Sequence, residues 1–397
     1  MKSLALLLSL AAGPALLTAL TALPAQAQQN VVAAAASATP AAVNAHYAAL
    51  VHANYADTLQ AAQALRQRIK DLVAQPSLEH LQAARKAWLA ARECYGQTEA
   101  FRFYGGPIDN DKGPEGQLNA WPMDESYVDG LDGKSGGLIG KRGFKITKAS
   151  LAAQNERGGE ENVATGWHAI EFLLWGQDLS PTGPGDRSFE DFVDGKAPNA
   201  DRRRQYLVVV TDLLIDDLQG LLNAWAPGAK NNYRARFEKG GQESLRKMLV
   251  GMGSLSRGEL AGERLEVALA SQDQEDEHSC FSDNTHRDAV TNALGIENVW
   301  LGRYQRADGT LLQGPALRDL VAAKDAALAQ RLSEQMAGSV VAAGKIQAPF
   351  DQEIMGDKTA PGRLRIQATI DSLTAQSKLL VEAATAVGIT KLTLVQP

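Results

Sequence analysis

The six residues 166–171, Gly-Trp-His-Ala-Ile-Glu, place an imidazole and a carboxylate three positions apart in an apolar run. Within residues 162–177, Glu171 is the only formally charged side chain, and no proline interrupts the run. We predict a buried helix that ends at Gly176, with His168 and Glu171 on one face. A buried carboxylate is costly unless it is paired or binds a metal. The two residues are therefore either part of a metal site or a hydrogen-bonded pair that fixes packing.

A second segment rich in ionisable residues spans 272–288 and contains six carboxylates and two histidines. An acidic run is commonly a solvated loop. Cys280 and Phe281 in its middle nevertheless predict that part of it turns inward. It lacks the alternating acidic ligands and the central glycine of an EF-hand. Upstream, Glu259 and Glu263 are either ligands or an exposed charged pair, and their spacing alone favours the exposed pair.

Several standard catalytic motifs are missing from the chain. It has no His-Glu-x-x-His, and Phe172 stands where the inverse zinc-protease motif needs a histidine. Gly-x-Ser-x-Gly, the P-loop and Cys-x-x-Cys are also missing, so there is no haem c attachment motif. A conventional zinc-protease helix is therefore not encoded.

The N-terminal residues predict export. Residues 1–27 combine Lys2, an apolar stretch and a small-x-small cleavage site at Ala25-Gln26-Ala27. A membrane anchor is the rival interpretation, but Pro14 and the cleavage site favour a cleaved signal peptide and a periplasmic protein. No later run is long enough to span a bilayer. The net charge of −6 gives no indication of nucleic-acid binding.

Only two cysteines are present, Cys94 and Cys280. An oxidising compartment permits a disulfide between them, which would join the two halves of the chain. The alternative is two buried free thiols.

The rest of the chain predicts an all-α protein, because alanine is abundant and strand signals are sparse. After a flexible segment, 28–40, we expect helices over 41–74 and 77–103, with Ser77 as an N-cap. Two long loops, 105–161 and 180–199, flank the His168 helix. The remaining expected helices are 201–225, 231–253, 256–272, 284–302, 315–342 and 361–387. Pro227-Gly228 divides this series into two bundles, 41–227 and 228–397.

These segments resemble the imelysin family, including its branch of iron-regulated A proteins. Gly166, His168 and Glu171 match the family's Gly-x-His-x-x-Glu signature. The other matching blocks are 95–103, 119–122 and 277–285, in the same order. The resemblance covers most of the chain after the signal segment. It implies an all-α fold of two stacked four-helix bundles with a buried site near their interface. It also implies an exported bacterial protein that is often linked to iron limitation.

On this basis we expect a periplasmic metal-binding protein that serves iron or metal acquisition. His168 and Glu171 would bind or orient a divalent metal, with Glu99 as the third group; Zn, Fe and Mn all suit such donors. Its partners would be a metal ion or an iron-containing ligand and iron-uptake proteins of the cell envelope. The further candidate ligand-binding residues are Arg102, Trp121, Asp276, Glu277, Ser279 and Asp283.

Two alternatives stay open. The family is classed among metallopeptidases, and in a zinc peptidase Glu171 would be the catalytic group that activates a metal-bound water. A hydrolytic zinc site needs three ligands and an open position, whereas the signature supplies two. The other alternative is a metal-free module that binds haem or polysaccharide, with His168 and Glu171 as a structural pair.

Overall fold

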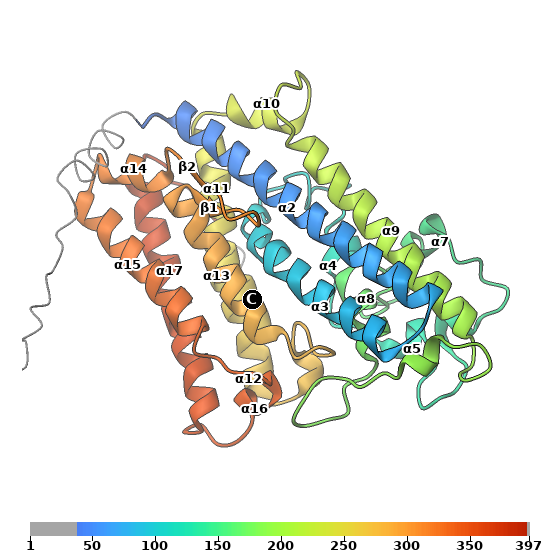
Figure 1. Cartoon of the computed structure of the whole chain (residues 1–397). Helices are drawn as coiled ribbons and strands as arrows, with labels where there is room; N and C mark the ends of the chain where they lie inside the picture. Colours follow the sequence, from blue (N-terminus) through green and yellow to red (C-terminus); the bar gives the residue numbers. More distant parts are fainter. Residues whose placement is uncertain (1–37, 395–397) are drawn as a thin grey trace, which may run out of the picture.

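The computed structural model describes residues 38–394. The predicted signal peptide and nearly all of the predicted flexible segment 28–40 lie outside these residues. The predicted all-α class is confirmed, since helices dominate the chain (Figure 1). The eight longest elements with regular α-helical geometry are α2 (Pro40–Ala74), α3 (Leu78–Tyr95), α8 (Gly166–Trp175), α9 (Ala200–Ala224), α11 (Gln242–Ser254), α13 (Thr285–Leu301), α15 (Ala326–Ala343) and α17 (Pro361–Ala386). Within residues 38–394, no helix is long and apolar enough for a membrane span.

The expected helix ends are formed by the expected caps. The Ser77 hydroxyl accepts a hydrogen bond from the backbone N–H of His80 at 3.2 Å, as an N-cap does. Gly176 adopts a positive φ of 77° and donates its N–H to the carbonyl of Phe172 at 2.7 Å. The glycine therefore ends α8 in a conformation that other residues rarely adopt.

Two expected helices change geometry along their length. The helix predicted over 77–103 is α-helical to Tyr95 and continues as the 3₁₀ helix η1 (Gly96–Phe101). The helix predicted over 256–272 begins as a twelve-residue π-helix, η3 (Leu255–Glu266), before α12 (Val267–Ser271). Apolar spacing predicts a helix but does not tell an i+4 hydrogen-bond pattern from an i+5 pattern.

A small hairpin was not predicted. Strands β1 (Arg303–Gln305) and β2 (Leu311–Gln313) pair antiparallel, with Tyr304 opposite Leu312. Three-residue strands are too short to show a period of two, so the sequence indicated only the turn between them.

The long helices form two groups that lie side by side (Figure 1). In one, α2 packs against α3 and α9, and α8 packs against the same two helices. In the other, α17 packs against α11, η3 and α15, and α13 packs against η3 and α15. Helix η1 contacts α2 and α3 on one side and α11 and α13 on the other, so this 3₁₀ turn lies between the groups. The predicted boundary at Pro227-Gly228 falls in the connection between α9 and α10 (Tyr233–Glu238).

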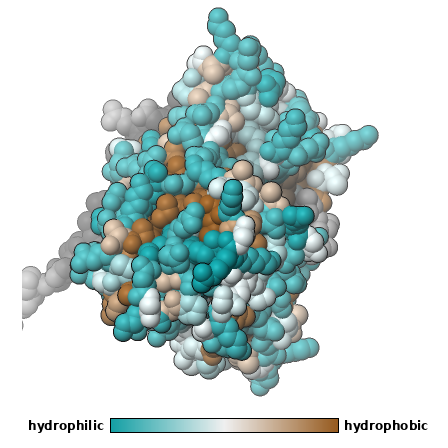
Figure 2. Space-filling view, turned by 90° about the vertical axis from the view of Figure 1, so that its right-hand side faces the viewer, coloured by the Kyte–Doolittle hydropathy of each residue, from teal (hydrophilic) through white to brown (hydrophobic). Residues whose placement is uncertain are grey.

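The long loops carry short helices. Segment 105–161 contains α4 (Glu115–Asn119), α5 (Glu125–Val128), α6 (Gly137–Gly140) and α7 (Lys148–Ala152), and segment 180–199 contains η2 (Phe189–Phe192). The side of the molecule with α5 and α7 faces the viewer in Figure 2, where hydrophilic residues surround an apolar area near the centre. The other short elements are η4 (Gln274–Asp276), α14 (Leu317–Ala322) and α16 (Phe350–Ile354).

Candidate metal and ligand site

Helix α8 is buried along its whole length, and its first residue explains the glycine of the signature. Gly166 has a φ of +83°, and a Cβ at this position would lie 2.4 Å from the backbone oxygen of Leu118 in α4. Only glycine fits both the conformation and the close approach of the two backbones. The glycine thus lets α8 begin directly against α4, close to the polar residues that α4 carries.

His168 and Glu171 form the predicted pair on one face of α8. The Nδ1 atom of His168 lies 2.8 Å from Oε2 of Glu171, and both side chains are buried. The other oxygen, Oε1, accepts hydrogen bonds from the Ser282 N–H at 3.0 Å and hydroxyl at 2.6 Å. Burial raises the pKa of Glu171 to about 8 and, with help from Arg92, lowers the pKa of His168 well below its ordinary value. His168 is therefore a neutral imidazole, the form that binds metals.

His278 lies next to this pair. Its ring centroid is 5.0 Å from that of His168 and 5.2 Å from that of Trp121, both in edge-to-face geometry. The Nε2 atom lies 3.3 Å from Asn119 Nδ2, and Nδ1 lies 3.2 Å from Asp288 Oδ2. Burial lowers the pKa of His278 to about 3. Both ring nitrogens of His278 thus lie near protein groups, although Nδ1 makes no hydrogen bond to Asp288 and is, like His168 Nε2, buried without a hydrogen-bond partner.

Arg92 holds in place Asn119 and Asp288, the two residues nearest the ring nitrogens of His278. Its guanidinium donates to Asn119 Oδ1 at 2.7 Å and to Asp288 Oδ1 at 3.0 Å. The hydroxyl of Ser279 donates to Asp288 Oδ2 at 2.5 Å. Burial alone would raise the pKa of Asp288, but Arg92 and His278 outweigh it and hold the pKa well below its ordinary value. Three aromatic rings surround the guanidinium: Trp88, Tyr95 and Trp167.

Glu99 belongs to a second buried network. Its Oε2 atom accepts hydrogen bonds from Arg102 at 2.6 Å and from Arg264 at 2.8 Å. Arg264 also donates to Glu259 at 2.8 Å and to Asn292 at 2.6 Å. Burial opposes ionisation of Glu99, yet the two arginines hold its pKa well below its ordinary value. Glu99 is therefore a carboxylate, and its Oε1 atom is buried without a hydrogen-bond partner.

A pocket with a volume of about 400 Å³ lies beside these networks. Five glutamates line it together with a single arginine, Arg102, so its wall is predominantly acidic. Asn119 and Trp121, which contact His278, are part of the same wall. The glutamates are Glu115, Glu156, Glu160, Glu259 and Glu263. Such a wall attracts cations.

The remaining predicted residues fall elsewhere. Asp276 is half-buried on η4, outside the contacts described above. Glu277 and Asp283 gather with Asp178 and Asp351 in a separate acidic cluster. Among the described residues, only Asp178, Asp283 and Asp351 form a set of three or more candidate metal ligands with ligand atoms within 4.8 Å of one another.

The two cysteines do not form the suggested disulfide. Cys94 and Cys280 are both free thiols, which corresponds to the alternative interpretation. Cys94 lies near the end of α3 and Cys280 in the buried loop before α13. Burial raises the pKa of both thiols, to about 11 for Cys94, so neither is an activated nucleophile.

The prediction missed several residues of the site. Arg92 stands among the apolar positions of α3, so an arginine on the inward face was a usable signal. His278, Asp288 and Arg264 lie in segments rich in other charged residues, and nothing in their spacing distinguishes them. Their roles follow from contacts between residues that are distant in the sequence.

Comparison with known proteins agrees with this architecture. The imelysin family model matches residues 51–380. The chain is 27% identical over 342 residues to "Iron-regulated protein A" of Synechococcus elongatus, covering 83% of each protein. A crystal structure described as a candidate iron-regulated protein A precursor from Parabacteroides distasonis has a TM-score of 0.71 at 20% identity, covering 88% of this chain and 95% of that one. Since the family model matches most of the chain, this protein belongs to the imelysin family.

Proposed function

We propose that this protein is an exported metal-binding protein that serves iron or metal acquisition in the periplasm. The observation that supports this most directly is the state of His168. Its Nδ1 atom is fixed by Glu171, while its Nε2 atom is buried without a hydrogen-bond partner. A metal ion would satisfy this neutral imidazole nitrogen, which no protein group reaches.

The available donors fit a borderline metal ion. His168 Nε2 and Glu99 Oε1 would bind the metal, since both atoms are buried and have no hydrogen-bond partner. Glu171 would orient His168, because both of its oxygens are already engaged in hydrogen bonds with His168 and Ser282. Imidazole and carboxylate donors suit Zn, Fe and Mn. In such a site the metal would supply a Lewis acid or a bound cargo.

The acidic pocket and the relatives support a cationic cargo. The glutamates around Arg102 would raise the local concentration of cations beside the His168 pair. The relative from Synechococcus elongatus is named for iron regulation, which favours iron or an iron-containing ligand. Iron-uptake proteins of the cell envelope would then be its partners, and the predicted signal peptide would deliver the protein to them.

Peptide hydrolysis is less well supported by the geometry. A peptidase needs a carboxylate that is free to take a proton from the attacking water. Both oxygens of Glu171 are engaged, with His168 and with Ser282. We therefore favour binding over hydrolysis, and a peptidase assay on the metal-loaded protein is part of the test.

The test is metal binding by the processed protein, residues 28–397. Metal content after export and calorimetric titration with Zn²⁺, Mn²⁺ and Fe²⁺ would be measured for the native sequence and three variants. We expect near-stoichiometric metal, no binding by His168→Ala, and about 10–100-fold weaker binding by Glu171→Gln. His80→Ala makes the same change on the surface of α3 and should bind normally. Equal affinity in native protein and His168→Ala contradicts the proposal, and peptide cleavage lost in both site variants would replace it with the peptidase.

A further inference from the structure

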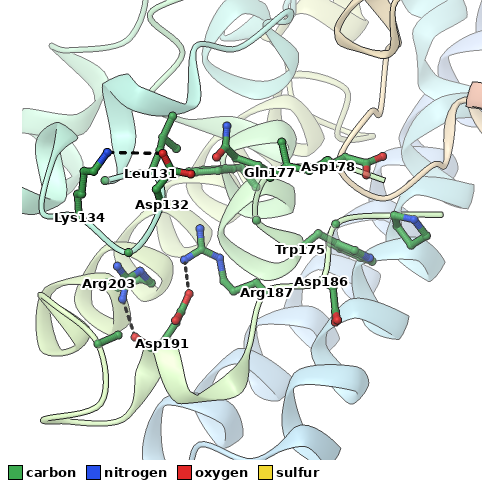
Figure 3. A pocket seen from close by; sticks show the side chains of 18 of the residues that line it. Leu131, Asp132, Lys134, Trp175, Gln177, Asp178, Asp186, Arg187, Asp191 and Arg203 are labelled. Carbon is green, nitrogen blue, oxygen red and sulfur yellow. Dashed lines mark hydrogen bonds and ion pairs between the residues drawn. The ribbon is translucent and has the colours of Figure 1, made fainter. Parts of the chain in front are cut away.

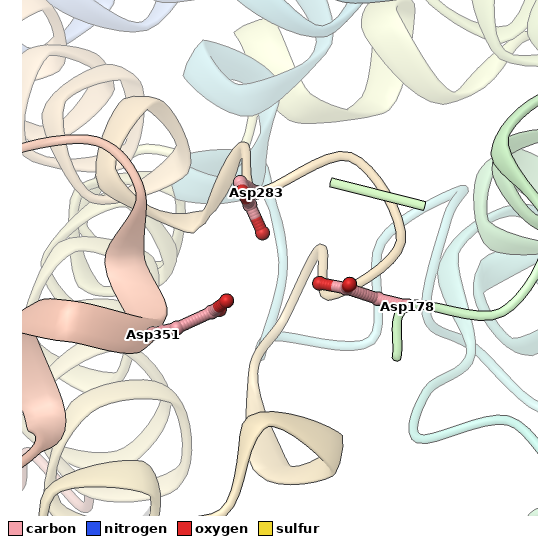
Figure 4. Close-up of side chains that lie close together, drawn as sticks. All are labelled: Asp178, Asp283 and Asp351. Carbon is pink, nitrogen blue, oxygen red and sulfur yellow. The ribbon is translucent and has the colours of Figure 1, made fainter. Parts of the chain in front are cut away.

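Four carboxylates from three distant segments meet in one place, away from His168. Asp178 follows α8, Glu277 and Asp283 belong to the loop before α13, and Asp351 lies on α16. Figure 4 shows Asp178, Asp283 and Asp351 pointing toward one another. One oxygen from each of these three aspartates lies within 4.8 Å of the others.

These carboxylates are buried and have few hydrogen-bond donors. Their exposures are 2% for Asp178 and Glu277 and 4% for Asp283 and Asp351. Only Asp178 Oδ1 accepts a hydrogen bond, from the Ser180 N–H at 2.9 Å. The other seven oxygens are buried without a partner among the described residues. Seven unsatisfied oxygens in one place are an exception among folded proteins, where buried polar groups are almost always paired.

Glu277 is an independent indication that something fills the cluster. It is not one of the three aspartates, yet its strongest side-chain interactions are with Asp351 and Asp283. Both of its oxygens are buried without a partner. No lysine, arginine or histidine of the described chain forms an ion pair with any of the four carboxylates; the ion pairs of residues 38–394 all involve other acids. The neutralising group is therefore not a side chain of the described protein.

We propose that Asp178, Glu277, Asp283 and Asp351 form a Ca²⁺ site that joins the two helical groups. The donor set is all oxygen, which selects a hard cation and disfavours the thiolate- and imidazole-seeking metals. Mg²⁺ usually keeps several waters and binds only one or two carboxylates, whereas Ca²⁺ accepts a larger set of protein oxygens in a flexible geometry. Four buried carboxylates, three of which have oxygens within 4.8 Å of one another, therefore suit Ca²⁺.

The alternative to a bound cation is that the carboxyl groups of the cluster are protonated and share hydrogen bonds. Burial and neighbouring carboxylates raise the pKa of Asp283 to about 8, and burial raises that of Asp178 to about 6. Shared protons would explain the gathered oxygens up to neutral pH. As the pH rises through about 8, the carboxyl groups of an empty cluster would lose protons and repel one another, so the two explanations predict different behaviour on chelation at alkaline pH.

Two pockets adjoin the cluster. Asp178 lines a pocket of about 520 Å³ that lies beyond the end of α8 (Figure 3). Asp283 lines a different pocket of about 550 Å³, together with Pro349. The four carboxylates are buried, but two of the residues that carry them line these pockets, so a cation would have only a short path to the cluster.

The position of the proposed Ca²⁺ site suggests that it orders the loop before α13. Asp283 is adjacent to Ser282, which holds Glu171, and the same loop carries His278 and Ser279. A Ca²⁺ ion would fix this loop between α8 and α16 (Phe350–Ile354). It would thereby stabilise the contacts on which the His168 pair depends without touching that pair.

The test uses processed protein, residues 28–397, freed of cations by chelation and titrated with CaCl₂ at pH 8. We expect one Ca²⁺ per chain, a Kd no weaker than about 10⁻⁴ M, and a melting temperature about 3–5 °C higher in excess Ca²⁺ than in EDTA. Asp283→Asn and Asp351→Asn should each weaken Ca²⁺ binding at least tenfold. Asp371→Asn, the same change on an exposed face of α17, should bind Ca²⁺ like the native protein.

The effect of Asp351→Asn on the melting temperature in EDTA distinguishes a cation site from a cluster with a purely structural role. Removing a charge from an empty cluster relieves repulsion, so Asp351→Asn should melt at or above the native protein in EDTA but below it in Ca²⁺. Lower melting temperatures in both conditions, or native protein that binds no Ca²⁺ and melts alike in both, overturn the proposal. His168→Ala should keep Ca²⁺ binding, so this outcome is separate from the test of the His168 site.

Discussion

Burial determines the chemistry of the ionisable side chains at the candidate site. His168 is neutral because its charged form would lose hydration, and Glu171 is expensive to ionise for the same reason. A hydrogen bond between His168 Nδ1 and Glu171 Oε2 joins the two side chains and leaves His168 Nε2 without a partner. The His168–Glu171 pair was predictable, because helical spacing alone brings i and i+3 together.

The neutral state of His278 predicts a specific acid sensitivity. Its pKa is about 3 in the folded protein and about 6.5 when unfolded, so between these values the unfolded chain binds the extra proton. Stability should therefore fall as pH drops from about 6.5 to 3, by up to about 1.4 kcal/mol per pH unit for this one group. Chemical denaturation at a series of pH values measures the slope.

His278→Gln is the matched variant for this prediction. Glutamine does not titrate, so the pH slope of the variant should be smaller by about one proton, whatever the change in absolute stability. His168 and Asp288, the other titratable groups that face His278, are still present in the variant. Identical slopes in the two proteins would show that His278 does not stay neutral on folding.

At the scale of elements, the π-helix η3 positions the charges behind the acidic pocket. Residues five apart approach each other along a π-helix, and Arg264 donates to Glu259, five residues earlier, at 2.8 Å. The same guanidinium reaches Glu99 on η1, so one buried arginine joins η3 to the 3₁₀ helix that lies between the two groups. Sequence periodicity predicted a helix over this segment but placed Glu259 on an exposed face.

Arg264→Ala should be strongly destabilising. The side chain is 1% exposed, and its loss would leave Glu99 with one cationic partner in a buried position. Breaking a buried ion pair costs about 3–5 kcal/mol. Arg257→Ala is the control, because Arg257 lies on the same π-helix and pairs at 3.2 Å with the partly exposed Glu266. That change should cost about 1 kcal/mol or less. Urea denaturation of both variants measures the difference, and equal losses would contradict a special role for Arg264.

At the scale of the whole molecule, segments distant in the sequence meet in the space between the two helical groups. Loop 277–284 supplies His278, Ser279 and Ser282 to the His168 site and Glu277 and Asp283 to the acidic cluster. Helix η1 also contacts helices of both groups. Because loop 277–284 contributes to both sites, a change in its conformation at one site would also affect the other.

The proposed Ca²⁺ site predicts how that loop responds to chelation. EDTA should increase amide hydrogen exchange in residues 277–284, including the Ser282 N–H that donates to Glu171, by about tenfold or more. Amides in the middle of α9 should exchange at the same rate in both conditions, since α9 does not contact the cluster. Unchanged protection of the loop would mean that the packing of Cys280 and Phe281 orders it without a cation.

The sequence by itself determined the helices, their caps at Ser77 and Gly176, and the His168–Glu171 pair. Each of these depends on residues within about one or two helical turns, where spacing fixes geometry. Tertiary structure decided the rest. It placed His278 beside His168 and paired Glu99 with two arginines. It also left the two thiols unpaired and brought Asp178, Asp283 and Asp351 together. Contacts between distant segments depend on how whole helices pack, and no local pattern in the chain carries that information.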